Sequence, residues 1–278
     1  MFHFMFINNR YILITGAASG IGLGLVQYCL QHGVRQLILL DCDEEAIHRL
    51  KAAYAAKKNV QVITIDIGDD NAVKALSNML ALSLPCIDMV INCAGVSGPF
   101  GPVWEVPKEQ VDWTLTVNLI GTVNVARHFI PLLHTSKHPN PCFVSVSSHL
   151  GLVTQGHLFS YQITKHAIVA FTEALQQDCQ GLEPSIQFAI FFPYFVKSNL
   201  ANSGRHLINN QKKIHVSSDS RDFFHGIEKE TELGIEAIDA AKILCDGLAA
   251  NAVYIFTNKQ TLQDFNQRIE HIKDNAYC

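Results

Sequence analysis

Short, almost continuously apolar runs alternate along this chain with longer amphipathic stretches. Because the runs lack polar alternation, we expect strands that are buried on both faces, as in a parallel sheet. The predicted strands are rich in Ile, Val and Phe and cover Tyr11–Thr15, Gln36–Leu40, Val60–Ile65, Ile87–Asn92, Cys142–Ser147, Ile186–Phe191 and Val253–Thr257.

The amphipathic stretches predict helices. They cover Ile21–Gln31, Asp43–Ala56, Asp69–Leu80, Lys108–Leu133, Ser160–Gln180 and Gly234–Leu248. This alternation predicts an α/β fold, a Rossmann-type doubly wound parallel sheet of about seven strands with helices on both faces. No linker or internal repeat divides the chain, so residues 1–278 are expected to form a single domain.

One long segment lacks both patterns. Residues 195–232 are polar and rich in Asn and Ser. Irregular segments of this length in compact domains usually serve as lids or binding loops. We therefore expect a flexible substrate loop here, and the alternative is a disordered insert.

Composition and charge exclude several classes of protein. The 278 residues are 48% hydrophobic and 17% charged, which excludes disorder driven by low hydrophobicity. A net charge of −4 argues against a nucleic-acid partner, for which a basic patch is expected. Tyr11–Val34 carries no charge and is long enough to span a bilayer, but its glycines favour a strand, a turn and a helix. We expect no membrane span.

The eight cysteines are scattered and contain no C-x-x-C pair. In a chain of this length, that pattern favours a reducing cytoplasm over a disulfide framework or a zinc site. The apolar N-terminus lacks a basic region and a cleavage site, so we expect no secretory signal. The sequence therefore predicts a cytoplasmic protein without a bound metal.

A glycine-rich turn, Thr15–Gly22, follows the first predicted strand. Gly16 permits the turn, Gly20 lets the backbone approach a pyrophosphate, and Gly22 lets the helix pack against the sheet. The helix N-terminus offers unpaired N–H groups to the same anion. This arrangement is typical of a dinucleotide site.

Asp41 ends the second predicted strand, 19 positions after Gly22. This fits the roughly 20-residue spacing of a carboxylate that binds the adenosine ribose. A carboxylate repels a 2′-phosphate, and Ala17, Ala18 and Cys42 supply no compensating arginine. NAD is therefore expected, with NADP less favoured. A role as N-cap of the next helix is compatible with this one.

Tyr161 and Lys165 form a Y-x-x-x-K motif in the predicted helix Ser160–Gln180. Four residues make about one helical turn, so both side chains share a face. A phenol with a pKa of about 10 is a poor base at neutral pH. A nearby ammonium and the positive charge of an oxidised nicotinamide lower that pKa. Tyr161 can then take a proton from a substrate hydroxyl or give one to a carbonyl.

A second match to this motif, Tyr54 with Lys58, is separated from the first by its context. Ser148 ends a predicted strand thirteen residues before Tyr161, whereas Asp41 stands thirteen residues before Tyr54. Asp41 is already assigned to the ribose. We expect Tyr54 to be an ordinary residue of an amphipathic helix.

These motifs resemble the short-chain dehydrogenase/reductase family over about residues 10–200. Thr15–Gly22 resembles the family's T-G-x-x-x-G-x-G turn. The N-C-A-G of Asn92–Gly95 resembles its N-N-A-G, with a cysteine for the second asparagine. Ser148, Tyr161 and Lys165 match its catalytic serine, tyrosine and lysine.

The resemblance implies a role for each matched residue. Ser148 would orient the reacting oxygen, Lys165 would also bond the nicotinamide ribose, and Asn118 would hold a water for Lys165. Asp66 would hold the adenine amine. The implied cofactor contacts are Gly16, Ser19, Gly20, Ile21, Gly22, Asp41, Asp66, Ile67, Asn92, Ala94, Gly95, Tyr161, Lys165, Pro193, Val196 and Ser198. Tyr194 stands where the family usually has a glycine.

The segment beside Ser148, His149–Phe159, is largely apolar, and Phe195 opens the long polar segment. A pocket lined in this way suits a hydrophobic secondary alcohol or ketone. The expected substrate contacts are Ser148, His149, His157, Tyr161 and Phe195. For the two histidines, the alternative is an ordinary place in a loop.

Together these features predict an NAD-dependent oxidoreductase that interconverts a secondary alcohol and a ketone by hydride transfer. One alternative is a catalytically silent NAD-binding sensor or regulatory protein of the same fold, and another is a different nucleotide-fold enzyme such as a methyltransferase. The resemblance also implies a homodimer or homotetramer through helices 108–133 and 160–180, which carry more apolar residues than one face needs. Burial inside the domain is the alternative for those residues.

Overall fold

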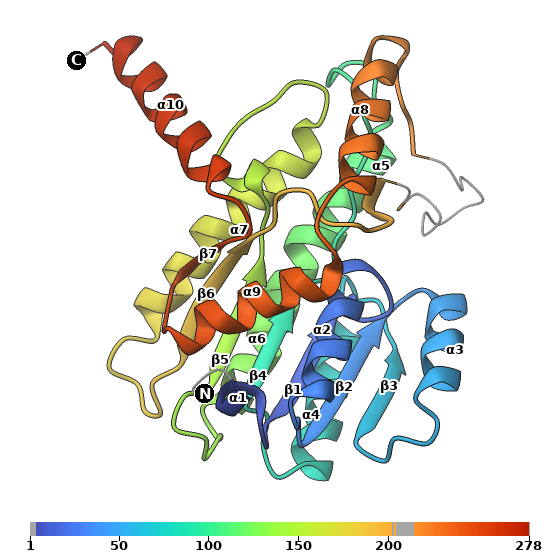
Figure 1. Ribbon diagram of the computed structural model, residues 1–278, viewed down its shortest axis with the longest axis vertical. Helices are drawn as coiled ribbons and strands as arrows, with labels where there is room; N and C mark the ends of the chain where they lie inside the picture. Colours follow the sequence, from blue (N-terminus) through green and yellow to red (C-terminus); the bar gives the residue numbers. More distant parts are fainter. Residues whose placement is uncertain (1–3, 202, 204–213, 278) are drawn as a thin grey trace.

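A computed structural model describes residues 4–201, 203 and 214–277. It contains a parallel seven-stranded sheet in the order β3-β2-β1-β4-β5-β6-β7 (Figure 1). The strands are β1 (Tyr11–Thr15), β2 (Gln36–Asp41), β3 (Val60–Thr64), β4 (Met89–Asn92), β5 (Cys142–Val146), β6 (Gln187–Phe192) and β7 (Tyr254–Phe256). The predicted doubly wound α/β fold is confirmed, and each predicted strand is present within two residues of its expected ends.

Helices cover both faces of the sheet. They are α1 (Phe4–Ile7), α2 (Gly20–Gln31), α3 (Glu44–Ala53), α4 (Asp70–Ser83), α5 (Lys108–Leu115), α6 (Gly121–Leu133), α7 (Phe159–Asp178), α8 (Arg221–Glu232), α9 (Ala237–Ala249) and α10 (Gln260–Asp274). Helices α2, α3 and α9 share one core cluster with the sheet, while α4, α6 and α7 share another on the opposite face.

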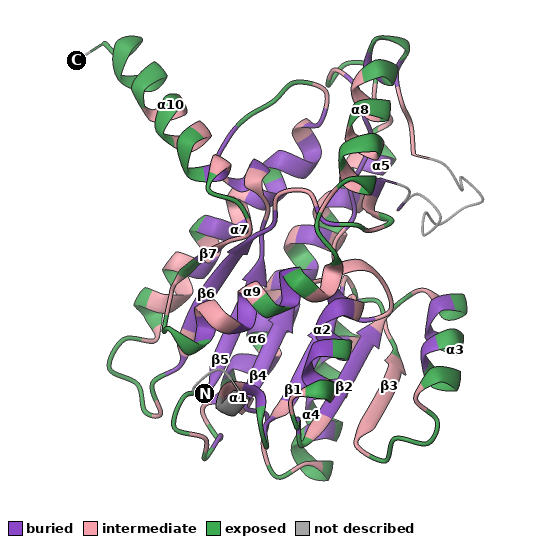
Figure 2. Cartoon of the chain, viewed as in Figure 1, coloured by how far each residue is buried: buried purple, intermediate pink, exposed green. Residues whose placement is uncertain are grey.

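Alternation along β1 shows why the strands carry unbroken apolar runs. Ile12 and Ile14 face the cluster that contains α2 and α9, and Leu13 faces the cluster that contains α4 and α6. All three side chains are fully buried. Burying each contributes roughly 1.5–3 kcal/mol, so an apolar residue is favoured at every position. The central strands are accordingly buried along their length (Figure 2).

The strand order places a crevice at one edge of the sheet. β1 pairs with β2 on one side and with β4 on the other, so the chain crosses over β1 between β3 and β4. Ligands of such sheets bind outside the carboxyl ends of the strands at this switch point. The glycine-rich turn after β1 and the segment after β4 both begin there.

Several helical segments differ from the sequence prediction, the short helix α1 among them. The expected helix Lys108–Leu133 contains a π-helical turn, Thr116–Ile120, between α5 and α6. The end of the segment expected to be irregular, residues 195–232, is helix α8. Helix α10 was not predicted at all. Residues 202 and 204–213 of the expected loop lie outside the described residues.

The uncharged stretch Tyr11–Val34 folds as β1, a turn and α2, as expected. Within residues 4–201, 203 and 214–277, no helix is both long enough and apolar enough to cross a bilayer.

Candidate active site

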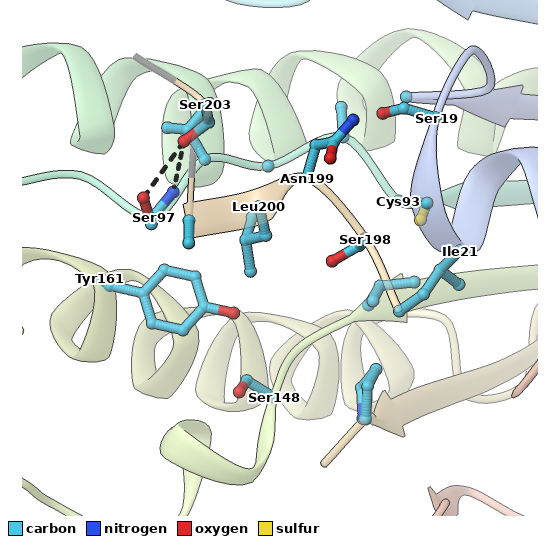
Figure 3. Close-up of a pocket in the computed structure, with 18 of the residues that line it drawn as sticks. Ser19, Ile21, Cys93, Ser97, Ser148, Tyr161, Ser198, Asn199, Leu200 and Ser203 are labelled. Atoms are coloured by element: carbon cyan, nitrogen blue, oxygen red, sulfur yellow. Dashed lines mark hydrogen bonds between the residues drawn. The ribbon is translucent and has the colours of Figure 1, made fainter. Parts of the chain in front are cut away.

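A cleft of about 1140 Å³ lies at the carboxyl ends of β1, β4, β5 and β6 (Figure 3). Most residues predicted to contact cofactor or substrate line it: Gly16, Ser19, Gly20, Ile21, Gly22, Asp41, Asp66, Ile67, Ala94, Gly95, Ser148, His149, Tyr161, Lys165, Pro193, Phe195, Val196 and Ser198. Asn92, Asn118 and His157 are absent from its walls. The structure therefore brings these residues from seven separate sequence segments to one cleft.

The glycine-rich turn packs its backbone closely against neighbouring segments, where a side chain would collide. Gly16 has a φ of +64°, and a Cβ there would lie 2.8 Å from the Cα of Ala94. A Cβ on Gly22 would lie 2.0 Å from the carbonyl oxygen of Gly16. Ser19 precedes α2 without capping it through its side chain, so the first N–H groups of α2 remain available to an anion.

Asp41 lies at the end of β2, where it also supports the turn. Its carboxylate accepts hydrogen bonds from the N–H of Ala18 at 2.9 Å and of Asp43 at 3.1 Å. The alternative role of Asp41 as a helix N-cap is wrong, because Asp43 caps α3 by accepting from the N–H of Ala46. Asp41 is thus fixed on the wall of the cleft.

The cleft near Asp41 contains more acidic residues than were predicted there from the sequence. Asp43, Glu44 and Glu45 line it as well. After the neighbouring strand β3, the carboxylate of Asp66 accepts a hydrogen bond from the N–H of Gly68 at 2.8 Å. The carboxylates at this end of the cleft are those of Asp41, Asp43, Glu44 and Glu45. Their negative charges make the binding of an additional phosphate unfavourable here.

Asn92 lies behind the cleft rather than in it. It is 3% exposed, accepts a hydrogen bond from the Thr15 hydroxyl at 2.8 Å and donates one to Thr122 at 2.7 Å. The Thr15 oxygen in turn accepts from the N–H groups of Cys93 and Ala94, each at 3.0 Å. Its amide ties β1, β4 and α6 together, and the expected contact of Asn92 with a cofactor stays a prediction.

Cys93, the departure from the family's N-N-A-G, does line the cleft (Figure 3). Burial raises the pKa of its thiol to about 12, although the charge of Lys165 opposes this rise. The thiol is therefore neutral at pH 7. The backbone hydrogen bonds to Thr15 show that the segment keeps its support without the second asparagine.

Tyr161 of α7 and Ser148, which follows β5, point into the same cleft (Figure 3). Tyr161 is 7% exposed. Burial raises the pKa of its phenol to about 12, and a hydrogen bond with Ser148 opposes that rise. Ser148 has extended backbone, and its hydroxyl also accepts from the N–H of Leu150 at 3.2 Å.

Lys165 lies one helical turn beyond Tyr161, with its Nζ 5.5 Å from the centre of the tyrosine ring. Its Nζ donates to the carbonyl of Val146 at 2.9 Å. Burial lowers the pKa of this lysine from 10.5 to about 8. The neighbouring Ser147 is not equivalent to Ser148, since its hydroxyl donates to the carbonyl of Lys165 at 2.9 Å.

Asn118 occupies the π-helical turn and is fully buried. Its side chain accepts from the N–H of Val96 at 2.8 Å and donates to the carbonyl of Val96 at 2.9 Å and the Thr164 hydroxyl at 3.1 Å. These bonds fix the segment after β4 and the residue just before Lys165. Single π-helical turns are frequent at functional sites. The implied water contact of Asn118 stays a prediction.

Tyr194 replaces the family's glycine without disturbing the loop after β6. Its N–H donates to the Thr257 hydroxyl at 2.8 Å. Its ring packs edge-on against Phe195 at 4.9 Å and against His149 at 4.7 Å. Pro193, Val196 and Ser198 consequently all remain on the wall of the cleft.

His157, an expected substrate residue, does not line the cleft. It has a φ of +68°, and its Nδ1 lies 2.7 Å from the hydroxyl of Ser220, directly before α8. Its ring packs 5.5 Å from that of Phe223. The structure places His157 outside the cleft, where it holds the start of α8.

Helix α8 closes the end of the cleft beside Tyr161. Its residues Phe223 and Ile227 line the cleft, and they join an apolar cluster that also contains Phe100, Leu150, Leu158, Tyr161 and Leu200. Figure 3 shows Leu200 reaching towards the Tyr161 side of the cleft. Helix α8 was not predicted from the sequence. The helical spacing of Phe223 and Ile227 within a polar segment is the signal that could have indicated it.

The fold and the cleft define a Rossmann-type protein with a glycine-rich turn at one end of the cleft and a serine–tyrosine–lysine group at the other. The chain belongs to the short-chain dehydrogenase/reductase family: the model of that family, described as short chain dehydrogenase, matches residues 10–207. This confirms the resemblance stated from the motifs.

The chain is similar to the 1-deoxy-11-beta-hydroxypentalenate dehydrogenase of Streptomyces exfoliatus, with 36% identity over 179 residues. That match covers 64% of this chain and 64% of the relative, less than two thirds of either. Two solved structures share the fold. One is a short chain dehydrogenase/reductase from Burkholderia phymatum in complex with NAD, with a TM-score of 0.87, 24% identity, and coverage of 100% of this chain and 98% of that chain. The other, from Burkholderia cenocepacia in complex with NADP, has a TM-score of 0.73, 18% identity, and coverage of 98% and 99%.

Proposed function

We propose that this protein is an NAD-dependent oxidoreductase that interconverts a secondary alcohol and a ketone on a hydrophobic small molecule. The observation that carries the proposal is the convergence of Ser148, Tyr161 and Lys165 at one end of a cleft whose other end fits a dinucleotide. The relative from Streptomyces is named as a dehydrogenase of a hydroxy compound, which supports the same class of reaction.

The mechanism follows from where the three side chains lie. Ser148 donates a hydrogen bond to the substrate oxygen and orients it. Tyr161 takes the hydroxyl proton during oxidation and returns it during reduction, and the Lys165 ammonium stabilises the phenolate. A nicotinamide dinucleotide held by the glycine-rich turn, Asp41 and Lys165 would supply the acceptor for the hydride of the alcohol carbon. The apolar wall made by Phe100, α8 and their neighbours excludes water from this step.

A panel of secondary alcohols, tested with NAD and NADP and followed by absorbance at 340 nm, tests the function. Reduction of NAD by apolar alcohols is the expected result. A sensor of the same fold would bind NAD but show no turnover with any alcohol of the panel. A methyltransferase would show neither NAD binding nor turnover.

Preference for NAD is expected to depend on Asp41. Removal of its carboxylate in Asp41→Ala removes the nearest negative charge from the site of a 2′-phosphate. We expect the ratio of kcat/KM for NAD to that for NADP to fall at least about tenfold, equivalent to 1.4 kcal/mol. Initial rates with both cofactors measure this ratio. Asp112→Ala is the matched control, because Asp112 is an exposed carboxylate of α5 that pairs with Lys108 and does not line the cleft. An unchanged ratio in Asp41→Ala removes Asp41 from cofactor selection.

We still propose that the protein forms a homodimer or homotetramer. In the structure, however, fewer apolar side chains of the two helical regions are available for an interface than the sequence suggested. Three apolar residues of the helices expected to form the interface, Phe129, Leu133 and Ile168, are buried within the chain. Ile120 and Ile163 are exposed on the same two helical regions, at 47% and 53%. Light scattering at micromolar concentration is expected to show at least a dimer; a monomer would contradict the proposal.

The cysteines support a cytoplasmic location as part of the same proposal. Each cysteine within the described residues is a free thiol. Free thiols are typical of proteins kept in a reducing compartment.

A further inference from the structure

Helix α10 packs against the protein only along its first half. It begins shortly after β7 and then leaves the body of the molecule (Figure 1). Thr261, Asp264, Phe265 and Arg268 follow the i, i+3, i+4, i+7 pattern of a single helical face. Thr261 is fully buried, whereas the helix from Glu270 onward is exposed (Figure 2).

This face of α10 contacts the residue that follows Ser148. The Asp264 carboxylate lies 3.7 Å from Nε2 of His149, and the Thr261 hydroxyl lies 3.4 Å from its Nδ1. Gln260 holds the other Asp264 oxygen at 2.8 Å. Because both ring nitrogens of His149 face α10, the helix determines the orientation of the imidazole.

On its other side, His149 forms part of the cleft. Its ring packs edge-on against Tyr194, and both residues line the cleft near Pro193 and Ser148. The N–H of His149 donates to the carbonyl of Pro193 at 2.9 Å. The imidazole therefore stands between α10 and the wall of the site, which explains why a predicted substrate residue turns its nitrogens away from the cleft.

Arg268 makes a second connection, to the segment after His149 and to α7. Its Nη1 donates to the carbonyl of Leu152 at 2.6 Å and to Nε2 of His166 at 2.9 Å. A guanidinium only donates, so His166 accepts through Nε2 and carries its proton on Nδ1, which lies 3.0 Å from the carbonyl of Gln162. Burial lowers the pKa of His166, consistent with a neutral ring. His166 directly follows Lys165.

Phe265 fills the space between these two polar contacts. It packs against the apolar cluster that contains Leu150, Val153 and Tyr161. The inner face of α10 thus contacts the segment after Ser148 through three polar residues, Thr261, Asp264 and Arg268, and one aromatic ring. No other element of the described chain offers polar contacts to both histidines.

We infer that Asp264 and Arg268 are positioning residues for the reaction. Through His149, Leu152 and His166 they hold the segment that carries Ser148 at a fixed distance from α7, which carries Tyr161 and Lys165. The inference rests on the proposed function. It adds that the C-terminal helix, which lies outside the cleft, sets the geometry of the catalytic side chains.

Kinetics of two variants test the inference. Asp264→Asn keeps the shape of the side chain and removes its charge, and Arg268→Gln removes both donated bonds. A misplacement of about 1 Å can cost roughly 100-fold in rate, so we expect kcat/KM for the alcohol to fall on the order of tenfold in each variant. The dissociation constant for NAD, measured by calorimetry, is expected to stay within about twofold of the wild-type value, because the nucleotide end of the cleft is remote from α10. Arg268→Lys should recover part of the loss.

Glu270→Gln is the matched control, because Glu270 lies on the exposed half of the same helix and pairs only with Lys273. Its kinetics are expected to equal those of the wild type. An NMR titration of the histidines, with His149 assigned through His149→Gln, gives a readout that is independent of turnover. Burial lowers the pKa of His149 and Asp264 raises it, so Asp264→Asn should lower that pKa further.

The outcomes separate this inference from the proposed function. An active wild type whose Asp264→Asn and Arg268→Gln variants keep kcat/KM within about twofold overturns the inference alone. An unchanged pKa of His149 in Asp264→Asn also overturns it. A wild type without turnover on the alcohol panel overturns the proposed function and, with it, the role of α10.

Discussion

Tyr161→Phe is expected to lower kcat by roughly 100- to 10,000-fold, the usual contribution of general acid–base catalysis, while NAD binding is retained. The variant removes one oxygen from a side chain that is 7% exposed and keeps the ring in place. The proton of the alcohol then has no acceptor among the residues that we place at the reacting centre. Turnover at 340 nm and calorimetric titration with NAD measure the two effects separately.

Tyr54→Phe is the matched control for this change. Tyr54 and Lys58 share the Y-x-x-x-K spacing, but Tyr54 is the C-cap of α3 and packs against the core beside β2 and β3. We expect its loss of a hydroxyl to leave kcat unchanged. Substantial turnover in Tyr161→Phe would show that another group takes the proton, and a loss of NAD binding would show that the phenol supports the fold of the cleft.

The sheet and the dinucleotide end of the cleft were predictable because their signals are local. The unbroken apolar sequences of strands such as β1 and β2 indicate that these strands are buried on both faces. In the turn, a Cβ on Gly22 would collide with the carbonyl of Gly16, so glycine is required at a fixed spacing. Asp41 is predictable for the same reason, since the length of α2 sets its distance from the turn.

Side-chain direction was much less predictable than position along the chain. Asn92 and Asn118 were expected at the site, and both lie next to it, but their amides bond to Thr15, Thr122, Val96 and Thr164. These partners come from other elements. A sequence pattern gives no information on which of two neighbouring faces an amide occupies. The same holds for His157, whose positive φ turns its ring to Ser220.

Helices α8 and α10 were missed because their stability depends on distant contacts. Phe224 of α8 packs edge-on against Phe100 at 4.9 Å, and α10 depends on His149 and Leu152. Most of their remaining residues are polar, so hydropathy alone indicates loops. Tertiary packing on a narrow apolar stripe supplies most of the stability of such helices, and that packing is invisible in a window of sequence.

Lys165→Met is expected to abolish turnover and at the same time to stabilise the protein at neutral pH. Turnover is lost because the phenolate of Tyr161 loses its neighbouring ammonium. The stability argument rests on burial, which leaves Lys165 3% exposed and lowers its pKa from 10.5 to about 8. Below pH 8, the folded protein holds a charge that the unfolded chain solvates better, and a shift of this size costs about 3 kcal/mol.

The sign of the pH dependence makes this prediction specific. Between pH 8 and pH 10.5 the unfolded chain keeps the Lys165 proton that the folded protein releases, so the stability of the wild type rises with pH in that window. The advantage of Lys165→Met is therefore largest below pH 8 and is lost by about pH 10.5. In the variant, the carbonyl of Val146 loses its hydrogen-bond partner, which lowers the free energy of unfolding by roughly 1 kcal/mol. We therefore expect the free energy of unfolding of Lys165→Met to exceed that of the wild type by about 1–2 kcal/mol at pH 7.

Chemical denaturation at pH 7 and pH 10 measures this difference in the free energy of unfolding. Lys58→Met, at the exposed lysine of the second Y-x-x-x-K, is the control and is expected to change neither stability nor turnover. A Lys165→Met protein that is less stable than the wild type at pH 7 would mean that the ammonium is well compensated by its surroundings. Burial would then not destabilise the Lys165 ammonium in the folded protein, and its pKa would not be lowered. Loss of turnover together with a gain in stability instead identifies Lys165 as a residue kept for chemistry at the expense of the fold.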